Sequence, residues 1–419
     1  MEKMDTEVII IGAGISGLSC ANNLMNAGIH FLMLEADQKV GGRIKSDFFD
    51  GFILDHGFQV LQTAYPEARQ QLNYERLDLK PFSPGVAIRL EKGLVYISDP
   101  VRRPQEFWRT LTAPIGTTID KFRVLALYAG NRIKGTDGIF ESPDISTIDF
   151  LRAYGFSQGM IERFFRPFFA GACLDPQIKT SSRVFRYLFD IFASGDAALP
   201  ANGMGAIPLQ LSKGIPPDQI RFNAKVESIN KNGAVLTTGQ KIMGKTIVIA
   251  TEGPETGRLL KVPVAPSSRG ERCLYYSAKT PPISKPFLVL NGKGKGLINN
   301  IAIPTLNAPT YSASGDSLIA VVILAKQSMD DQSLKQAVQK ELIQWFGDVV
   351  MEWNHIKTYR IDHALPDQSP PVANPTRGFI QVKDNIYVCG EYASVPGIQW
   401  ALLSGRLTAQ QIIKDYQSI

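Results

Sequence analysis

The pattern of apolar positions near the start of this 419-residue chain predicts a strand, a glycine turn, a helix and a second strand. The pattern runs from Glu7 to Glu35, and no Asp, Glu, Lys or Arg occurs between Val8 and Leu34. An uncharged stretch of this length could also span a membrane. Its glycines, its paired asparagines and its histidine argue against a span, so we expect a strand-turn-helix-strand unit.

The spacing of apolar residues changes twice in the middle of the chain. Residues 100–195 are expected to be mainly helical, because apolar residues recur at steps of three and four, as in Val184, Tyr187 and Leu188. From Ile220 onward the pattern favours short strands, with a hairpin turn at Asn232-Gly233. The strands are expected at 224–229, 234–238, 246–250, 287–290, 318–324 and 385–389, and helices near 333–345 and 398–416.

The glycine turn has the spacing of a dinucleotide-binding site. Gly12 would let the chain turn sharply after the strand, Gly14 would let the backbone approach a pyrophosphate, and Gly17 would let the helix pack closely on the sheet. The helix N-terminus offers free N–H groups to the phosphates. Glu35, at the end of the second strand, can accept hydrogen bonds from a ribose 2′-hydroxyl but would repel a 2′-phosphate. The pattern therefore favours FAD or NAD over NADP.

Composition narrows the class of protein only a little. With 44% apolar residues, the chain can bury a large core and is expected to form two domains. Its four cysteines lack the spacing of metal or redox motifs, so we expect reduced thiols and no metal site. A leader peptide is not expected, because Glu2 and Asp5 offset Lys3. A cytoplasmic location follows, with peripheral membrane association left open.

The net charge of +6 is unevenly distributed. Residues 89–134 hold nine Lys or Arg against four Asp or Glu, a local excess of +5, with aromatic and aliphatic residues between them. Such a segment could lie on an anionic membrane surface, or it could form ordinary amphipathic helices that pack on a core. Nucleic acid is not an expected partner, because the basic residues form no repeated array.

Several short motifs, taken together, resemble one family. They are Gly12-x-Gly14-x-x-Gly17, Glu35, Gly41-Gly42-Arg43, Asp55-His-Gly57-Phe-Gln, Pro200-x-Asn-Gly203-Met204, Gly390-Glu391 and Ser404-Gly405-Arg406. In this order, and over about the whole length, the chain resembles the flavin amine oxidase, protoporphyrinogen oxidase and phytoene desaturase superfamily, most of all the phytoene desaturase-like branch.

The resemblance implies an α/β fold with noncovalent FAD as cofactor. A Rossmann-type FAD-binding domain would comprise residues 1–85, 196–265 and 380–419. A discontinuous α+β substrate domain, made of a helical insert and an antiparallel sheet, would comprise residues 86–195 and 266–379.

The resemblance also implies positions for individual residues around FAD. Glu35 would hold the adenosine ribose, Arg43 would lie by the pyrophosphate, and Val226 would contact the adenine; a surface ion pair of Arg43 with Glu391 is the alternative for those two. The full expected cofactor set is Gly12, Ala13, Gly14, Ile15, Ser16, Gly17, Glu35, Ala36, Gly42, Arg43, Gly57, Phe58, Val226, Gly390, Glu391, Ile398 and Gln399.

The expected catalytic residues are few, because the flavin itself accepts the hydride. Gln399, Trp400 and His56 are the candidates that the resemblance places beside the flavin, and a structural role is the alternative for His56. Trp400 stands where amine oxidases have a small residue, and neither a paired aromatic cage nor a flavin-facing lysine is recognisable.

These departures favour a bulky hydrophobic substrate over an amine. The leading hypothesis is an FAD-dependent oxidoreductase that dehydrogenates or otherwise remodels a carotenoid, isoprenoid or porphyrinogen by hydride transfer, with O₂ or a quinone as electron acceptor. The alternatives are an amine oxidase using O₂, a flavoprotein that binds lipid without turnover, and an isomerase that needs reduced flavin.

Overall fold

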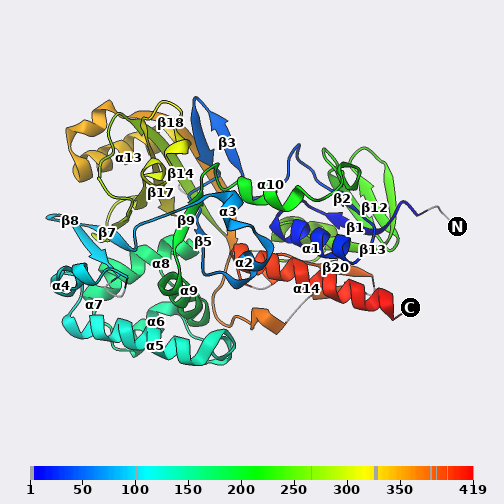
Figure 1. Ribbon diagram of the computed structural model, residues 1–419, viewed down its shortest axis with the longest axis horizontal. Coiled ribbons are helices and arrows are strands. Elements are labelled where there is room, and N and C mark those ends of the chain that lie inside the picture. Colours follow the sequence, from blue (N-terminus) through cyan, green and yellow to red (C-terminus); the bar gives the residue numbers. More distant parts are fainter. Residues whose placement is uncertain are drawn as a thin grey trace.

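The structure is a computed structural model that describes residues 4–418, except 100–101, 266, 325–328, 378–379, 384 and 394. Two large sheets and a helical region organise the chain (Figure 1). An α/β fold with a separate sheet and a helical insert is thus confirmed. The boundaries of the two expected domains stay a prediction.

The first sheet is built from both ends of the chain and from the segment around residue 240. Its strands run β10 (Ile220–Arg221), β2 (Phe31–Leu34), β1 (Thr6–Ile11), β13 (Lys241–Ile249), β12 (Gly233–Leu236) and β11 (Val226–Asn230), with β20 (Ile386–Val388) also on β13 and β19 (Ile380–Lys383) on β20. The pairs β10–β2, β2–β1, β1–β13 and β13–β20 are parallel. Strand β1 is buried from Val8 to its end, which explains the apolar run Val8-Ile-Ile-Ile11.

Two helices from opposite ends of the chain pack side by side along this sheet. They are α1 (Ile15–Asn26) and α14 (Ile398–Gln417), drawn in blue and red in Figure 1. The hydroxyl of Ser19 donates to the carbonyl oxygen of Leu402 over 2.7 Å. A Cβ atom on Gly405 would lie 2.2 Å from the carbonyl oxygen of Ser16, so only glycine permits this close approach.

The second sheet separates two apolar layers. Its strands run β18 (Asn354–Pro366), β14 (Ser268–Ala278), β17 (Ser317–Leu324), β16 (Ile298–Ala302), β15 (Leu288–Asn291), β7 (Gly85–Leu90) and β8 (Gly93–Ser98). Successive residues of β14 alternate between the layers: Leu274 and Tyr276 pack with α13 (Asp331–Phe346), whereas Cys273 and Tyr275 belong to the main core.

The helical region covers the main-core side of this sheet, at the lower left of Figure 1. It contains α4 (Phe107–Thr112), α5 (Thr118–Glu141), α6 (Thr147–Ala153), α7 (Gln158–Met160), α8 (Arg166–Cys173) and α9 (Ser182–Ser194). Gly135, with φ +63°, interrupts α5. Aromatic rings of α8 and α9 pack against each other; for example, the ring centroids of Phe169 and Phe185 lie 4.6 Å apart.

Short elements join these parts. Strands β3 (Ser46–Phe49) and β4 (Phe52–Asp55) form a hairpin, and β5 (Leu61–Gln62), β9 (Ala197–Pro200) and β6 (Leu79–Pro81) form a small sheet. The remaining helices are α2 (Pro66–Gln71), α3 (Tyr74–Leu77), α10 (Ala206–Ser212), α11 (Gly253–Leu260) and α12 (Pro304–Asn307). Strand β13 begins at Lys241, five residues before the expected start, because its first part pairs with β12 in a hairpin.

Candidate active site

A cavity of about 1090 Å³ runs from the glycine turn to the helical region. At one end its wall includes Gly14, Glu35, Arg43 and Glu391. The wall at the other end is formed by aromatic and aliphatic side chains of α5, α8 and α9. The cavity thus connects residues expected at a dinucleotide with an apolar chamber.

The glycine turn is shaped by close backbone contacts. Gly12 has φ +104°, and a Cβ atom on Gly17 would lie 2.1 Å from the carbonyl oxygen of Gly12. No side chain caps the N-terminus of α1, so its first amides remain available to a ligand. Gly14 lies against Gly42, where a Cβ atom on Gly42 would be 3.3 Å from the Cα atom of Gly14. This bare backbone fits the pyrophosphate of FAD.

Glu35 is held in place by two backbone amides. Its Oε2 atom accepts from Ala13 N at 2.7 Å, and its Oε1 atom accepts from Asp37 N at 2.9 Å. The side chain lines the cavity. Each oxygen retains a further lone pair, so this carboxylate can also accept ribose hydroxyl groups. Val226 and Ala36 line the same end of the cavity.

Arg43 and Glu391 form an ion pair at the cavity wall. Arg43 Nη1 donates to Glu391 Oε1 and, over 2.7 Å, to the carbonyl oxygen of Ala364. Glu391 is 7% exposed, and its Oε2 atom accepts from Gly397 N at 3.2 Å. The two residues pair with each other, and both line the cavity.

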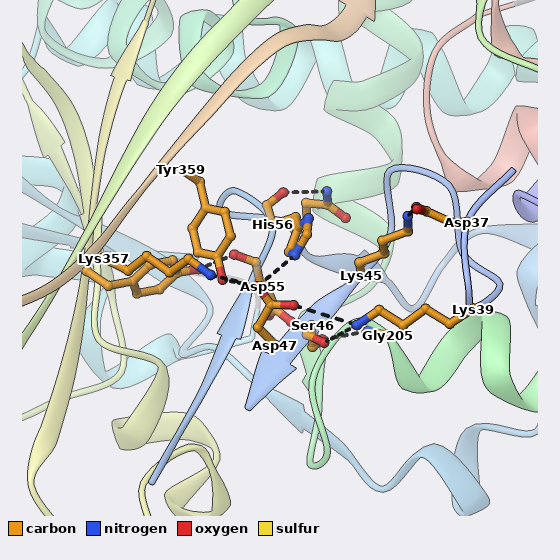
Figure 2. A network of polar contacts seen from close by, with 12 residues as sticks. Asp37, Lys39, Lys45, Ser46, Asp47, Asp55, His56, Gly205, Lys357 and Tyr359 are labelled. Carbon is orange, nitrogen blue, oxygen red and sulfur yellow. Dashed lines mark hydrogen bonds and ion pairs between the residues drawn. The ribbon is translucent and has the colours of Figure 1, made fainter. Parts of the chain in front are cut away.

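His56 also lines the cavity and is held by a polar network centred on Asp47 (Figure 2). Asp47 Oδ2 lies 2.9 Å from Lys357 Nζ, 2.7 Å from Tyr359 Oη and 3.1 Å from His56 Nε2. Partial burial opposes ionisation of Asp47, but these hydrogen bonds outweigh it and lower the pKa of its carboxyl. The His56 ring also lies on the Tyr359 ring, with centroids 4.8 Å apart.

Asp55 connects the Asp55-to-Gln59 motif with the Pro200-to-Met204 motif. Its Oδ1 atom accepts from Met204 N at 2.9 Å and from Ser46 Oγ at 2.5 Å, and its Oδ2 atom accepts from Tyr311 Oη at 2.8 Å. Burial raises the pKa of Asp55 to about 6, although these hydrogen bonds oppose the rise. The two motifs therefore hold one another beside the cavity.

Gln399 and Trp400 are buried in the first turn of α14. Gln399 Oε1 accepts from Glu67 N at 2.8 Å, and Trp400 packs against Tyr187 and Phe140. Neither belongs to the cavity wall among the residues that the structure describes. In the first turn of α14, Ile398 lines the cavity and the next two residues are buried, and the expected place of those two beside the flavin stays a prediction.

The remaining expected cofactor residues divide into two groups. Gly12, Ile15, Ser16, Phe58 and Gly390 line the cavity. Ala13, Gly17 and Gly57 support its wall through their backbone. Their roles toward FAD stay predictions.

Glu271 is an acidic cavity residue that was not expected from the sequence. Glu271, on β14, lines the cavity and is 5% exposed. Burial raises the pKa of its carboxyl to about 8, opposed by a hydrogen bond from the backbone amide of Phe58. The one available signal was an acidic residue within an otherwise strand-like run.

Two further classes of site were searched for in the described part of the chain. No group of three His, Cys, Asp or Glu residues there could hold a metal ion. No described helix combines the length and the apolarity needed to cross a bilayer.

Comparison with known proteins agrees with this geometry. The family model for flavin containing amine oxidoreductases matches residues 15–413. The chain is 25% identical over 262 residues to protoporphyrinogen oxidase 2, chloroplastic/mitochondrial, of Arabidopsis thaliana, which covers 54% of this chain and half the length of that relative. It is 24% identical to 15-cis-phytoene desaturase of Capsicum annuum, over 98% of this chain and 78% of that protein.

A solved structure shows the same fold. Cyclohexylamine oxidase from Brevibacterium oxydans IH-35A superposes with a TM-score of 0.68 at 16% identity, covering 99% of this chain and all of that chain. FAD as cofactor and the class of oxidoreductase are confirmed at the level of the family. The chain belongs to the flavin-containing amine oxidoreductase family.

Proposed function

We propose that this protein uses FAD to dehydrogenate or otherwise remodel a bulky hydrophobic substrate of the carotenoid, isoprenoid or porphyrinogen type. One observation carries the proposal: a single cavity joins the candidate FAD residues to a chamber walled by large apolar side chains. Relatives named for a porphyrinogen and for phytoene support the same substrate class.

The residues around the glycine turn fit FAD. Gly14 and Gly42 leave room for a pyrophosphate, Glu35 can hold the ribose, and Arg43 offers forked donors to phosphate oxygens. Ile398, at the N-terminus of α14, lines the cavity and would present the positive end of that helix to the flavin. FAD, when bound there, supplies the acceptor for a hydride.

The apolar chamber gives substrate binding without specific polar contacts. Five phenylalanine side chains line it, contributed by α8, α9 and the turn before α8: Phe164, Phe168, Phe169, Phe189 and Phe192. Burying apolar surface contributes roughly 25 cal/mol per Å², so a large hydrocarbon would be bound mainly by shape and desolvation. The same walls exclude water from the reacting C–H bond.

The surface of α4 and α5 suits substrate uptake from a membrane. Phe107, Trp108, Ile119, Phe122, Leu125 and Ile133 are exposed there. The exposed charged residues between 102 and 134 are all basic, namely Arg102, Arg109, Arg132 and Lys134. Phe107, Phe122 and Leu125 also line the cavity. We propose that this surface, here called the α4–α5 face, lies on an anionic membrane.

Anaerobic bleaching of the flavin absorbance tests the proposed function. Liposome-borne 15-cis-phytoene, protoporphyrinogen and a set of amines are supplied separately to the holoenzyme. We expect bleaching by phytoene or protoporphyrinogen alone, with the electrons of the substrate reducing the flavin. Bleaching by amines alone, with hydrogen peroxide formed in air, would instead identify an amine oxidase, and bleaching by none would favour a carrier or an isomerase.

A further inference from the structure

Glu271 lies where strand β14 meets the segment Asp55–Phe58. One face of β14 presents Glu271, Cys273 and Tyr275 to this segment. The Tyr275 hydroxyl donates to the carbonyl oxygen of Asp55 over 3.0 Å, and at the other end the backbone amide of Phe58 donates to the Glu271 carboxyl. Phe58 and Glu271 both line the cavity, so the carboxyl lies where this segment enters its wall.

The contact between Glu271 and Gly57 is unusually close. A Cβ atom on Gly57 would lie 2.0 Å from Glu271 Oε1 and 2.7 Å from Ile361 Cδ1. Gly57 also has φ +87°, a backbone conformation that glycine adopts without strain. Glycine at this position therefore makes room for the carboxyl in the cavity wall.

Glu271 has no ion-pair partner among the described residues, although charged groups surround it. Arg272 donates to Asp362 over 2.9 Å, and Arg269 lies 2.7 Å from both Asp175 and Asp367. On the neighbouring strand β18, Tyr359 donates to Asp47 and Arg360 donates to Asp331. His56 also faces Asp47. The Cys273 thiol and the Asp55 carboxyl are buried. On β17, the residue opposite Glu271 is Leu324.

The absence of a partner cation determines the charge of this carboxyl. Burial raises its pKa to about 8, and the single hydrogen bond from Phe58 does not offset the burial. The carboxyl is therefore neutral in acid and becomes anionic only in mildly alkaline solution. A carboxylate with a raised pKa is a stronger base than an ordinary one.

We propose that Glu271 is the proton acceptor of the dehydrogenation carried out in this cavity. FAD, when bound in the cavity, would accept one hydrogen of the substrate together with its electron pair. The neighbouring hydrogen leaves as a proton to a carboxylate oxygen of Glu271, and the electron pair of that second bond forms the new double bond. The carboxyl then releases the proton to solvent. This role rests on the proposed function.

Glu271→Gln tests the role in the holoenzyme. Glutamine can still accept the hydrogen bond from Phe58 but cannot take up a proton, so a merely structural role predicts no change. With whichever of 15-cis-phytoene, protoporphyrinogen or the amines bleaches the wild-type flavin, we expect the wild-type rate to rise with pH toward a plateau above about 8. The rate of E271Q should not rise with pH, and it should be on the order of 100-fold lower than the wild-type plateau. Glu271→Asp should recover part of the rate.

Infrared spectroscopy of the oxidised holoenzyme provides a readout without substrate. The wild type should show a protonated-carboxyl band that disappears with a midpoint near pH 8, and E271Q should lack it. Glu341→Gln is the matched control, because Glu341 is also a buried glutamate with a raised pKa but accepts from Leu297 N and Ile298 N outside the cavity. E341Q should keep both the band and the rate profile.

Two results would overturn the inference: an unchanged rate profile in an E271Q protein that holds stoichiometric FAD, or persistence in E271Q of the band with its midpoint near pH 8. Failure of the proposed function would give a different result. No probe would then bleach even the wild-type flavin, and both the reaction and the role of Glu271 in it would be excluded.

Discussion

At the scale of single residues, the buried carboxyl of Glu271 makes stability depend on pH. Its pKa rises from 4.5 to about 8 on folding, so the folded chain holds one more proton than the unfolded chain between these values. The resulting stability is fully present below pH 4.5 and is lost as the pH rises through about 8. We expect E271Q to lack this loss, which is on the order of 5 kcal/mol.

Thermal unfolding of the holoenzyme measures this pH-dependent loss of stability. The measurement covers roughly pH 5 to pH 9, the range in which Glu271 loses its proton. The difference in melting temperature between E271Q and the wild type should shift in favour of E271Q as the pH rises. Glu352→Gln, at an exposed glutamate, should follow the wild type. A constant difference between E271Q and wild type across the range would contradict the expected linkage.

At the scale of elements, the contact of α1 with α14 depends on one glycine. A Cβ atom on Gly405 would meet the backbone of α1 at Ser16 O and, 3.0 Å away, at Cys20 N. Gly405→Ala should therefore force the helices apart, cost about 1–3 kcal/mol, and weaken FAD binding because α1 carries the glycine turn. Urea unfolding and FAD titration measure the two effects.

Gly130→Ala is the matched control for that substitution. Gly130 also lies within a helix, α5, but a Cβ atom there would have no neighbour within 4 Å. Alanine at this position should stabilise the protein by about 0.5–1 kcal/mol. If both alanine variants were equally stable, close packing would not explain Gly405.

The elements that could be predicted from the sequence are those specified by local spacing. Gly12, Gly14 and Glu35 lie within one strand-turn-helix-strand unit, so their spacing along the chain was enough to predict that they lie close together. Helical periodicity predicted α14, but not the contacts that Gln399 and Trp400 make in its first turn. Glu271 and Gly57 lie far apart in the sequence and meet only in the folded chain, so spacing carries no signal for that contact.

At the scale of the whole molecule, the α4–α5 face lies at the lower left of Figure 1, away from the first sheet and from the β3–β4 hairpin at the top. Trp108 is 72% exposed and Phe122 is 61% exposed on this face. Replacing both by serine should lower binding to anionic vesicles on the order of tenfold or more, because two large side chains can no longer enter the lipid. Vesicle cosedimentation at low salt measures this binding.

Phe48→Ser provides the control for the same measurement. Phe48 is 79% exposed, so its loss also removes a large exposed apolar side chain, but it lies on β3, across the molecule from α5 (Figure 1). F48S should bind vesicles like the wild type, and added salt should weaken wild-type binding because Arg109, Arg132 and Lys134 contribute attraction to the lipid. Equal losses for F48S and the double variant would mean that any exposed aromatic residue suffices. The orientation in which the cavity opens toward the membrane would then be wrong, whereas a loss confined to the double variant would support uptake of the substrate through the α4–α5 face.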